Sequence, residues 1–97
     1  MTPVKKIEIV ADSLELEAIT RVLDQHGVSG YTVIRDVAGR GGRGERRGDE
    51  LTGVFTNSYV MTACQADQVD AIIAAVRPIL TRFGGVALIS DALWVVH

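Results

Sequence analysis

Cysteine, histidine and aromatic residues are scarce in this 97-residue sequence, and each scarcity excludes a class of site. The single cysteine, Cys64, cannot form a disulfide within the chain, so we expect a cytoplasmic protein whose thiol stays reduced. The two histidines, His26 and His97, lie far apart and lack the spacing that is typical of metal ligands, so the sequence predicts no metal site. No nucleophile stands beside a candidate base, so we expect no catalytic residues and no enzyme.

Long hydrophobic runs and a strong charge imbalance are also missing. The apolar runs are far shorter than the ~20 residues that a membrane span needs, so we expect no membrane insertion. The net charge is −2, and aromatic residues make up only 5% of the chain. A sheet that reads RNA stacks bases on aromatic side chains, and this composition offers too few of them. We therefore expect no nucleic-acid partner.

What the sequence does contain is a regular alternation of strand and helix patterns. The length fits a single domain over residues 1–97. Hydrophobic periodicity predicts strands over 4–11, 31–38, 54–64 and 86–90, helices over 13–26 and 66–83, and a short fifth strand over 93–96. We expect Pro78 to kink the second helix or to end it early, because proline cannot donate a helical hydrogen bond.

The two halves of the chain repeat the order strand, capped helix, glycine exit and strand. This duplication predicts an α+β, ferredoxin-like βαββαβ fold, with an antiparallel four-stranded sheet and both helices on one face. The other face of the sheet would carry apolar side chains without a cover. We therefore expect a homo-oligomer that packs through its sheets.

The stretch GRGGRGERRGDE, which begins at Gly39, interrupts this order. Residues 39–53 hold six of the ten glycines and four of the eight arginines. The stretch matches G-x-G-x-x-G, but no amphipathic helix follows, which excludes a dinucleotide-binding fold. Glycine-rich backbone can still turn its amides toward an anion, and arginines can bind phosphate or carboxylate. A second glycine pair, Gly84 and Gly85, closes the second helix and is either a simple helix cap or part of such a site.

Four segments resemble the PII signal-transduction superfamily over nearly the whole chain. They are KKIEIV, GVSGYTV at 27–33, ADQVDAIIAAV and FGGVALIS. The resemblance implies a homotrimer that binds adenine nucleotides in clefts between subunits. It also implies that a long loop between strands 2 and 3, the T-loop, contacts a target protein. In this sequence the T-loop spans about residues 39–53.

The resemblance also assigns residues to the nucleotide cleft. The T-loop base corresponds to Gly39 and Gly41, and the phosphate-binding loop to Gly84 and Gly85. The full set for the nucleotide is Thr32, Gly39, Arg40, Gly41, Gly84, Gly85 and Val86. Three further arginines of the T-loop, Arg43, Arg46 and Arg47, are implied as contacts for phosphate or a small anion.

Departures from the family pattern narrow the implied ligand. No tyrosine stands between Gly39 and Gly53, Val86 replaces the expected lysine after Gly85, and no arginine pair follows before His97. A ligand with less charge than ATP, namely ADP or AMP, suits this set better. The pattern resembles PII-like regulators linked to bicarbonate transporters and carboxysome operons. It implies bicarbonate as a co-ligand and a transporter or carboxysome-related protein as the target. The alternative is a structural trimer whose loop binds a protein constitutively.

Overall fold

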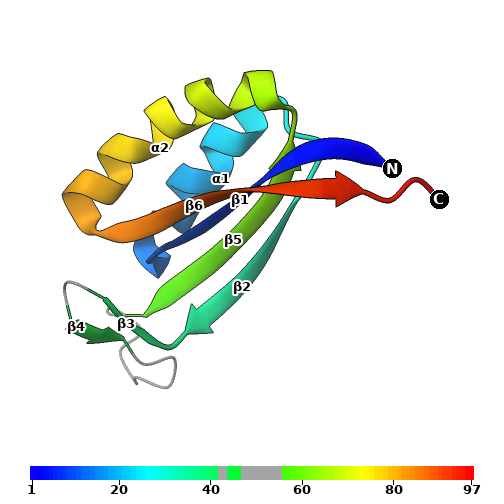
Figure 1. Ribbon diagram of the computed structural model, residues 1–97. Coiled ribbons are helices and arrows are strands. Elements are labelled where there is room, and N and C mark those ends of the chain that lie inside the picture. The colour runs from blue at the N-terminus through cyan, green and yellow to red at the C-terminus, as the bar shows by residue number, and fades with distance from the viewer. Residues whose placement is uncertain (42–43, 47–55) are drawn as a thin grey trace.

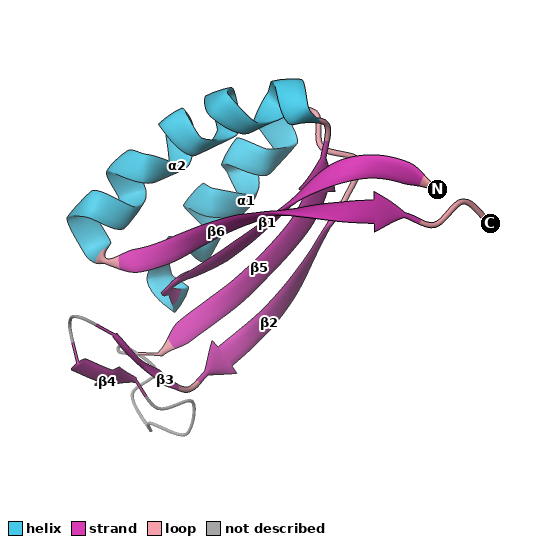
Figure 2. Ribbon diagram, viewed as in Figure 1, coloured by secondary structure: helices cyan, strands magenta, loops and turns pink. Residues whose placement is uncertain are grey.

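A computed structural model describes residues 1–41, 44–46 and 56–97 (Figure 1). Four strands form one antiparallel sheet in the order β2-β5-β1-β6: β1 (Thr2–Asp12), β2 (Tyr31–Val37), β5 (Asn57–Cys64) and β6 (Gly85–Trp94). The helices α1 (Leu16–Gln25) and α2 (Val69–Phe83) lie on the same face of this sheet (Figure 2). The predicted ferredoxin-like βαββαβ order is confirmed.

The hydrophobic core lies between the helices and the central strands. In β1, the alternate residues Ile7, Ile9 and Ala11 are buried toward the helices. The helices and β5 complete the core with Leu16, Ile19, Val22, Leu23, Val60, Cys64, Ile72 and Val76. This period of two in the strands and of about 3.6 in the helices explains why these segments form these elements.

In the part of the chain that the structure describes, no helix covers the opposite face of the sheet, called the open face below (Figure 2). Because directly paired residues share a face in antiparallel strands, the register assigns its members. They include Lys6, Glu8 and Val10 of β1, Tyr59 and Met61 of β5, Thr32 and Ile34 of β2, and Val86, Leu88 and Trp94 of β6.

Two caps mark the ends of the first helical segment. The Asp12 carboxylate accepts a hydrogen bond of 2.9 Å from the Leu14 amide and so caps the short 3₁₀ helix η1 (Ser13–Glu15) that leads into α1. Gly27 follows α1 with a φ of +70°, the left-handed conformation that ends many helices. A second 3₁₀ turn, η2 (Ala66–Gln68), leads into α2.

One expectation for the last third of the chain is wrong, and one of the two outcomes expected at Pro78 does not occur. Residues 93–96 do not form a separate strand, because Leu93 and Trp94 continue β6 and pair with Pro3 and Thr2. Pro78 does not end α2, which runs on to Phe83. The buried stripe of α2 continues past the proline through Ile79 and Leu80, and this packing outweighs one lost hydrogen bond.

The glycine- and arginine-rich segment contains structure that its composition did not predict. Two short strands, β3 (Gly39–Gly41) and β4 (Gly44–Arg46), pair antiparallel with Gly41 opposite Gly44. The rest of the predicted T-loop, residues 42–43 and 47–53, lies outside the described residues, as does the predicted start of the third strand at 54–55.

Candidate functional site

The predicted ligand-binding residues leave the sheet at one end, called the T-loop end below. On β2, the pairing with β5 shifts between Ile34 and Val37, and Asp36 adopts a φ of +59°. Among the described residues, Asp36 is the only non-glycine residue with a positive φ. This bulge bends the chain into β3, where Gly39, Arg40 and Gly41 lie. Arg46 ends β4, and Arg43 and Arg47 lie outside the described residues.

Gly84 and Gly85 connect α2 to β6 at the same end of the sheet. Gly84 has a φ of +85°, and its amide donates a 2.8 Å hydrogen bond to the Leu80 carbonyl. Gly85 has a φ of +132°, and a Cβ atom there would lie 2.6 Å from the Val10 carbonyl oxygen. Both glycines are therefore required by the fold of a single chain, whatever ligand they meet. Val86 follows on the open face with its side chain 54% exposed.

The structure separates the predicted residues into three groups within one chain. At the T-loop end, β5 and β1 stand between β2 and β6, so the two glycine segments leave the sheet about 14 Å apart. Thr32 is the second residue of β2 and pairs with Met61 on the open face, toward the other end of the strand. A single subunit therefore does not bring Thr32 together with Gly39–Gly41.

A cluster of hydroxyl groups fixes the point where the T-loop rejoins the sheet. The Ser13 amide donates to the Thr56 carbonyl at 2.9 Å, and the Thr56 hydroxyl donates to the Ser13 hydroxyl at 3.2 Å. The Ser13 and Ser58 hydroxyl groups lie 2.8 Å apart. Thr56 and Ser58 are buried. Sequence analysis missed this anchor, although the polar residues at alternate positions 56 and 58 were a signal of it.

A pocket of about 360 Å³ opens at the opposite end of the sheet, where both termini lie. Its volume is within the range of small-molecule sites. The lining residues come from β1, the loop after α1, the end of β5, η2 and the end of β6: Thr2, Val4, Gly27, Ser29, Ala63, Cys64, Gln65, Gln68 and Trp94. None of the predicted site residues that the structure describes lines it, so sequence analysis missed this pocket. The exposed Trp94 close to the C-terminus was its main signal.

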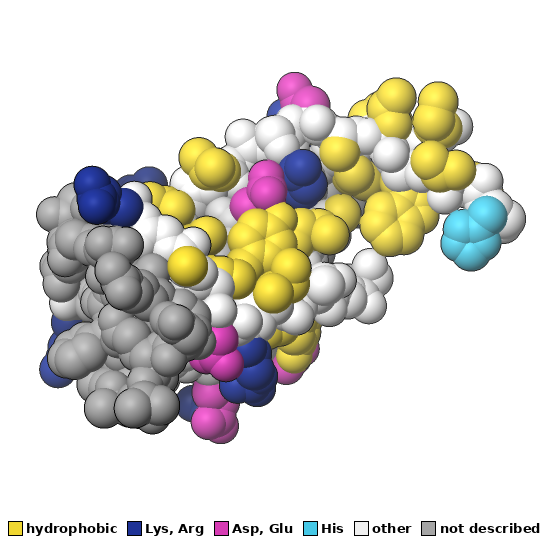
Figure 3. Space-filling model, turned by 90° about the horizontal axis from the view of Figure 1, so that it is seen from below, with side chains coloured by type: hydrophobic (Ala, Val, Ile, Leu, Met, Phe, Trp, Pro, Cys, Tyr) yellow, Lys and Arg dark blue, Asp and Glu magenta, His cyan; other side chains and the backbone are white. Residues whose placement is uncertain are grey.

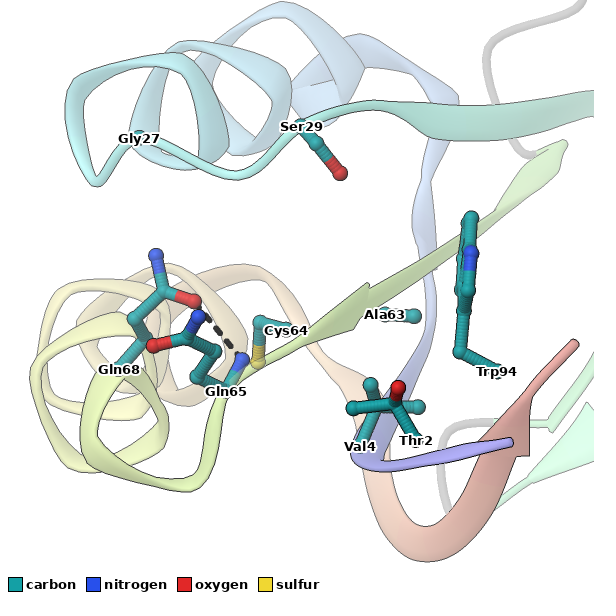
Figure 4. A pocket seen from close by; sticks show the side chains of 9 residues that line it. All are labelled: Thr2, Val4, Gly27, Ser29, Ala63, Cys64, Gln65, Gln68 and Trp94. Atoms are coloured by element: carbon teal, nitrogen blue, oxygen red, sulfur yellow. Dashed lines mark hydrogen bonds between the residues drawn. The ribbon is translucent and has the colours of Figure 1, made fainter. Parts of the chain in front are cut away.

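Polar groups fix one wall of this pocket and an aromatic ring forms another (Figure 4). The backbone amide of Gln65 donates a 2.8 Å hydrogen bond to the side-chain oxygen of Gln68. The side-chain amide of Gln68 in turn donates a 3.2 Å hydrogen bond to the backbone carbonyl of His26. Figure 4 shows the Ser29 hydroxyl pointing into the space between the two glutamines and the Trp94 indole. An apolar pocket with a flat aromatic wall and a few fixed amides suits a planar heterocycle.

Cys64 lines the pocket but remains almost covered, with 5% of its surface exposed. Burial, with a smaller contribution from the negative charge of Asp67, raises the pKa of its thiol. The thiolate is the reactive form of cysteine. We therefore expect the reaction of Cys64 with a thiol reagent at pH 8 to be slower by roughly tenfold or more in the native protein than in the chain unfolded by urea. Stopped-flow absorbance with a disulfide reagent measures both rates. Equal rates in the folded and unfolded chain would contradict this environment.

Among the described residues, no helix combines the length and the apolar composition that crossing a bilayer requires.

Comparison with known proteins identifies the family. The chain matches the model of the nitrogen regulatory protein P-II over residues 4–96. No curated protein sequence gives a significant match. A solved structure of CPII from Thiomonas intermedia, a nitrogen regulatory PII-like protein bound to ADP, AMP and bicarbonate, superposes with a TM-score of 0.86 at 26% identity. That match covers 93% of this chain and 86% of CPII.

Two further structures agree with this result. CPII bound to ADP and bicarbonate gives a TM-score of 0.83 at 27% identity, again covering 93% of this chain and 86% of that one. A PII-like signalling protein of Thermus thermophilus shares the fold, with a TM-score of 0.80, 23% identity and coverage of 98% and 91%. The family model spans both helices and all four strands of the main sheet, and the chain therefore belongs to the P-II family, a family of regulatory proteins rather than enzymes.

Proposed function

We propose that this chain is a signalling protein that binds ADP or AMP, with bicarbonate as a co-ligand, and changes the shape of its T-loop in response. The observation that carries the proposal is the likeness to CPII, which was solved with ADP, AMP and bicarbonate and superposes on 93% of this chain. The T-loop end supplies two glycine segments and Arg40, a residue type that binds phosphate through paired donors.

We place the nucleotide between subunits of a homotrimer. Within one chain the pocket at the terminal end and the glycine segments at the T-loop end are far apart. Thr2 pairs with Trp94 and Ala11 pairs with Gly85, nine residues further along β1, or about 30 Å. An assembly that sets the terminal end of one subunit against the T-loop end of the next would unite an aromatic pocket with a phosphate-binding segment.

The open face supports self-association. Four of its apolar residues have a large part of their surface exposed to solvent: 52% for Ile34, 54% for Val86, 62% for Leu88 and 48% for Trp94. Several exposed apolar side chains on one face of a small domain indicate a protein interface, and identical subunits are its commonest partners. The chain is short enough that burying this face would add substantially to its stability.

The charge of the T-loop end favours ADP or AMP over ATP. Val86 and Ala87 follow Gly85, so no lysine meets a terminal phosphate from this segment. Arg40 is the one cation that the described part of the predicted nucleotide set contributes. Each added phosphate group increases the charge that the cleft must neutralise.

Thermal unfolding with added nucleotide tests the proposal. A ligand that binds only the native state stabilises by about 2.7 kcal/mol at a hundredfold excess over Kd. For a domain of this size we expect ADP or AMP to raise the Tm by roughly 10 °C or more. GTP is the matched control and should give no comparable rise, whereas bicarbonate should add to the effect of the adenine nucleotide. No shift with any adenine nucleotide would favour the alternative, a structural trimer with a constitutive protein-binding loop.

The target that fits this ligand set is a bicarbonate transporter or a carboxysome-related protein. This target is the one that the resemblance to bicarbonate-linked PII-like regulators implies, and a sensor that binds bicarbonate would report on inorganic carbon. Pull-down with the purified protein in the presence and absence of ADP and bicarbonate tests this assignment. A target that binds equally well in both conditions would contradict ligand control of the T-loop.

A further inference from the structure

Three polar side chains form a network centred on Glu8 in the middle of the open face. The Tyr59 hydroxyl donates a 2.6 Å hydrogen bond to Glu8 Oε2. Lys6 Nζ lies 3.5 Å from Glu8 Oε1. The Glu8 carboxylate therefore has one partner on each oxygen, one from the adjacent strand β5 and one from its own strand β1. The hydrogen bond from Tyr59 is the main cause that lowers the pKa of Glu8, so the carboxylate stays ionised at neutral pH.

Hydrophobic side chains surround this network. In the sheet register, Glu8 pairs with Met61 on one side and with Leu88 on the other, while Tyr59 pairs with Val10 and Ile34. Figure 3 shows this face, where an acidic and a basic side chain lie beside hydrophobic ones. The Lys6 and Glu8 side chains are 39% and 27% exposed, so both already lie partly within the apolar surface.

A charged pair at such a place constrains what can cover it. A carboxylate that leaves water without hydrogen-bond partners costs several kcal/mol, whereas one with both oxygens paired costs much less. One lysine and one glutamate also leave the middle of the face with no net charge. This part of the face therefore offers no charge complementarity to a strongly acidic or basic partner. A second copy of the same face has its own neutral network, so the two copies would not repel each other electrostatically.

We propose that the Lys6–Glu8–Tyr59 network is the specificity element of self-association through the open face, allowing that face to be buried against further copies of this chain. The inference rests on the self-association in the proposed function and names the residues that control it. Each subunit satisfies its own Glu8 before assembly, so the assembled face holds no unpaired charge. The network also favours one arrangement of the subunits, because a shifted arrangement would press apolar side chains of one copy onto the charged groups of another.

Replacing Tyr59 with phenylalanine tests the network. Tyr59→Phe keeps the ring but leaves Glu8 Oε2 without its donor, so we expect the assembly to dissociate at a concentration roughly tenfold higher or more. Tyr31→Phe is the matched control, because Tyr31 lies on the edge strand β2 and pairs with Thr62 on the helix-facing side. It should leave the dissociation constant unchanged. Analytical ultracentrifugation over a dilution series measures both constants.

A triple substitution distinguishes the effect of an unpaired Glu8 on association from a general loss of folding. Replacing all three members by apolar residues (Lys6→Met, Glu8→Met and Tyr59→Phe) removes the charge together with its partners. We expect this variant to recover the association that Tyr59→Phe loses, because no unpaired carboxylate remains. If Tyr59→Phe assembles like the wild type, or if the triple variant stays as weak as Tyr59→Phe, the inference is overturned while the assembly itself stands. A wild-type chain that is monomeric at every concentration would overturn both the inference and the proposed trimer.

Discussion

Replacing Gly85 with alanine is expected to lower the free energy of unfolding by about 3 kcal/mol, a large share of the stability of a domain of this size. The added Cβ would lie 2.6 Å from the Val10 carbonyl oxygen, 2.9 Å from Leu80 Cδ2 and 3.2 Å from Ala11 Cα. Two of these contacts are backbone atoms of the central strand β1, which cannot move without disturbing the core. The φ of +132° adds strain for any residue with a side chain.

Substitutions at two other glycines separate the contribution of the steric clash from that of the backbone strain. A Cβ atom added at Gly30 would meet nothing within 4 Å, and its φ is not positive, so Gly30→Ala should change stability by no more than about 0.5 kcal/mol. Gly27 has the same open space but a φ of +70°, so Gly27→Ala should cost about 1 kcal/mol from backbone strain alone. Urea unfolding at one fixed protein concentration measures all three. Gly85→Ala and Gly30→Ala with equal stability would show that β6 does not approach β1 this closely.

The Gly85 result also bears on how the ligand site should be tested. A variant at Gly85 that fails to bind nucleotide cannot be assigned to the ligand site when its fold is already destabilised. Arg40 and Val86 are better probes, because their side chains are exposed and can be shortened without pressing on the central strand. This distinction follows from the structure and not from the sequence, where Gly84 and Gly85 look equally suited to a helix cap and to a phosphate loop.

The fold could be predicted because its elements follow local rules. Alternation at Ile7, Ile9 and Ala11 marks β1, and the stripe from Ile72 to Val76 marks α2. The cap at Asp12 and the exit at Gly27 mark the ends of the first helical segment. Each of these signals lies within a few residues of the feature that it predicts, and tertiary packing reinforces them.

The errors arise where distant residues decide the outcome. Trp94 continues β6 only because Thr2, at the other end of the chain, provides a strand to pair with. The terminal pocket is formed by segments from four parts of the sequence, so no local pattern could indicate it. The network of Lys6, Glu8 and Tyr59 likewise depends on the register between β1 and β5, which a one-residue shift would destroy.

Placing an aspartate at position 88 is expected to weaken self-association by roughly a hundredfold or more, because the open face would then bury an unpaired carboxylate. Leu88 is 62% exposed, so the isolated subunit loses little packing when it is replaced. Its cross-strand neighbour is Glu8, and Leu88→Asp would set two negative charges side by side. Leu14→Asp is the control, because Leu14 is 69% exposed in η1 on another part of the surface. Size-exclusion chromatography with light scattering compares their molar masses.

The same variant decides where the nucleotide binds. If the cleft is formed by two subunits, a folded monomeric Leu88→Asp chain should lose the stabilisation by ADP that Leu14→Asp retains. Circular dichroism confirms that the fold persists, and calorimetric titration measures the remaining affinity. Should the monomer bind ADP as tightly as the assembly does, the site must lie within one chain. The terminal pocket beside Trp94 would then be the place to look, since it is already complete in a single subunit. If the subunits dissociate and ADP still binds, nucleotide binding does not depend on assembly. The T-loop would then respond to a ligand that is bound by its own chain.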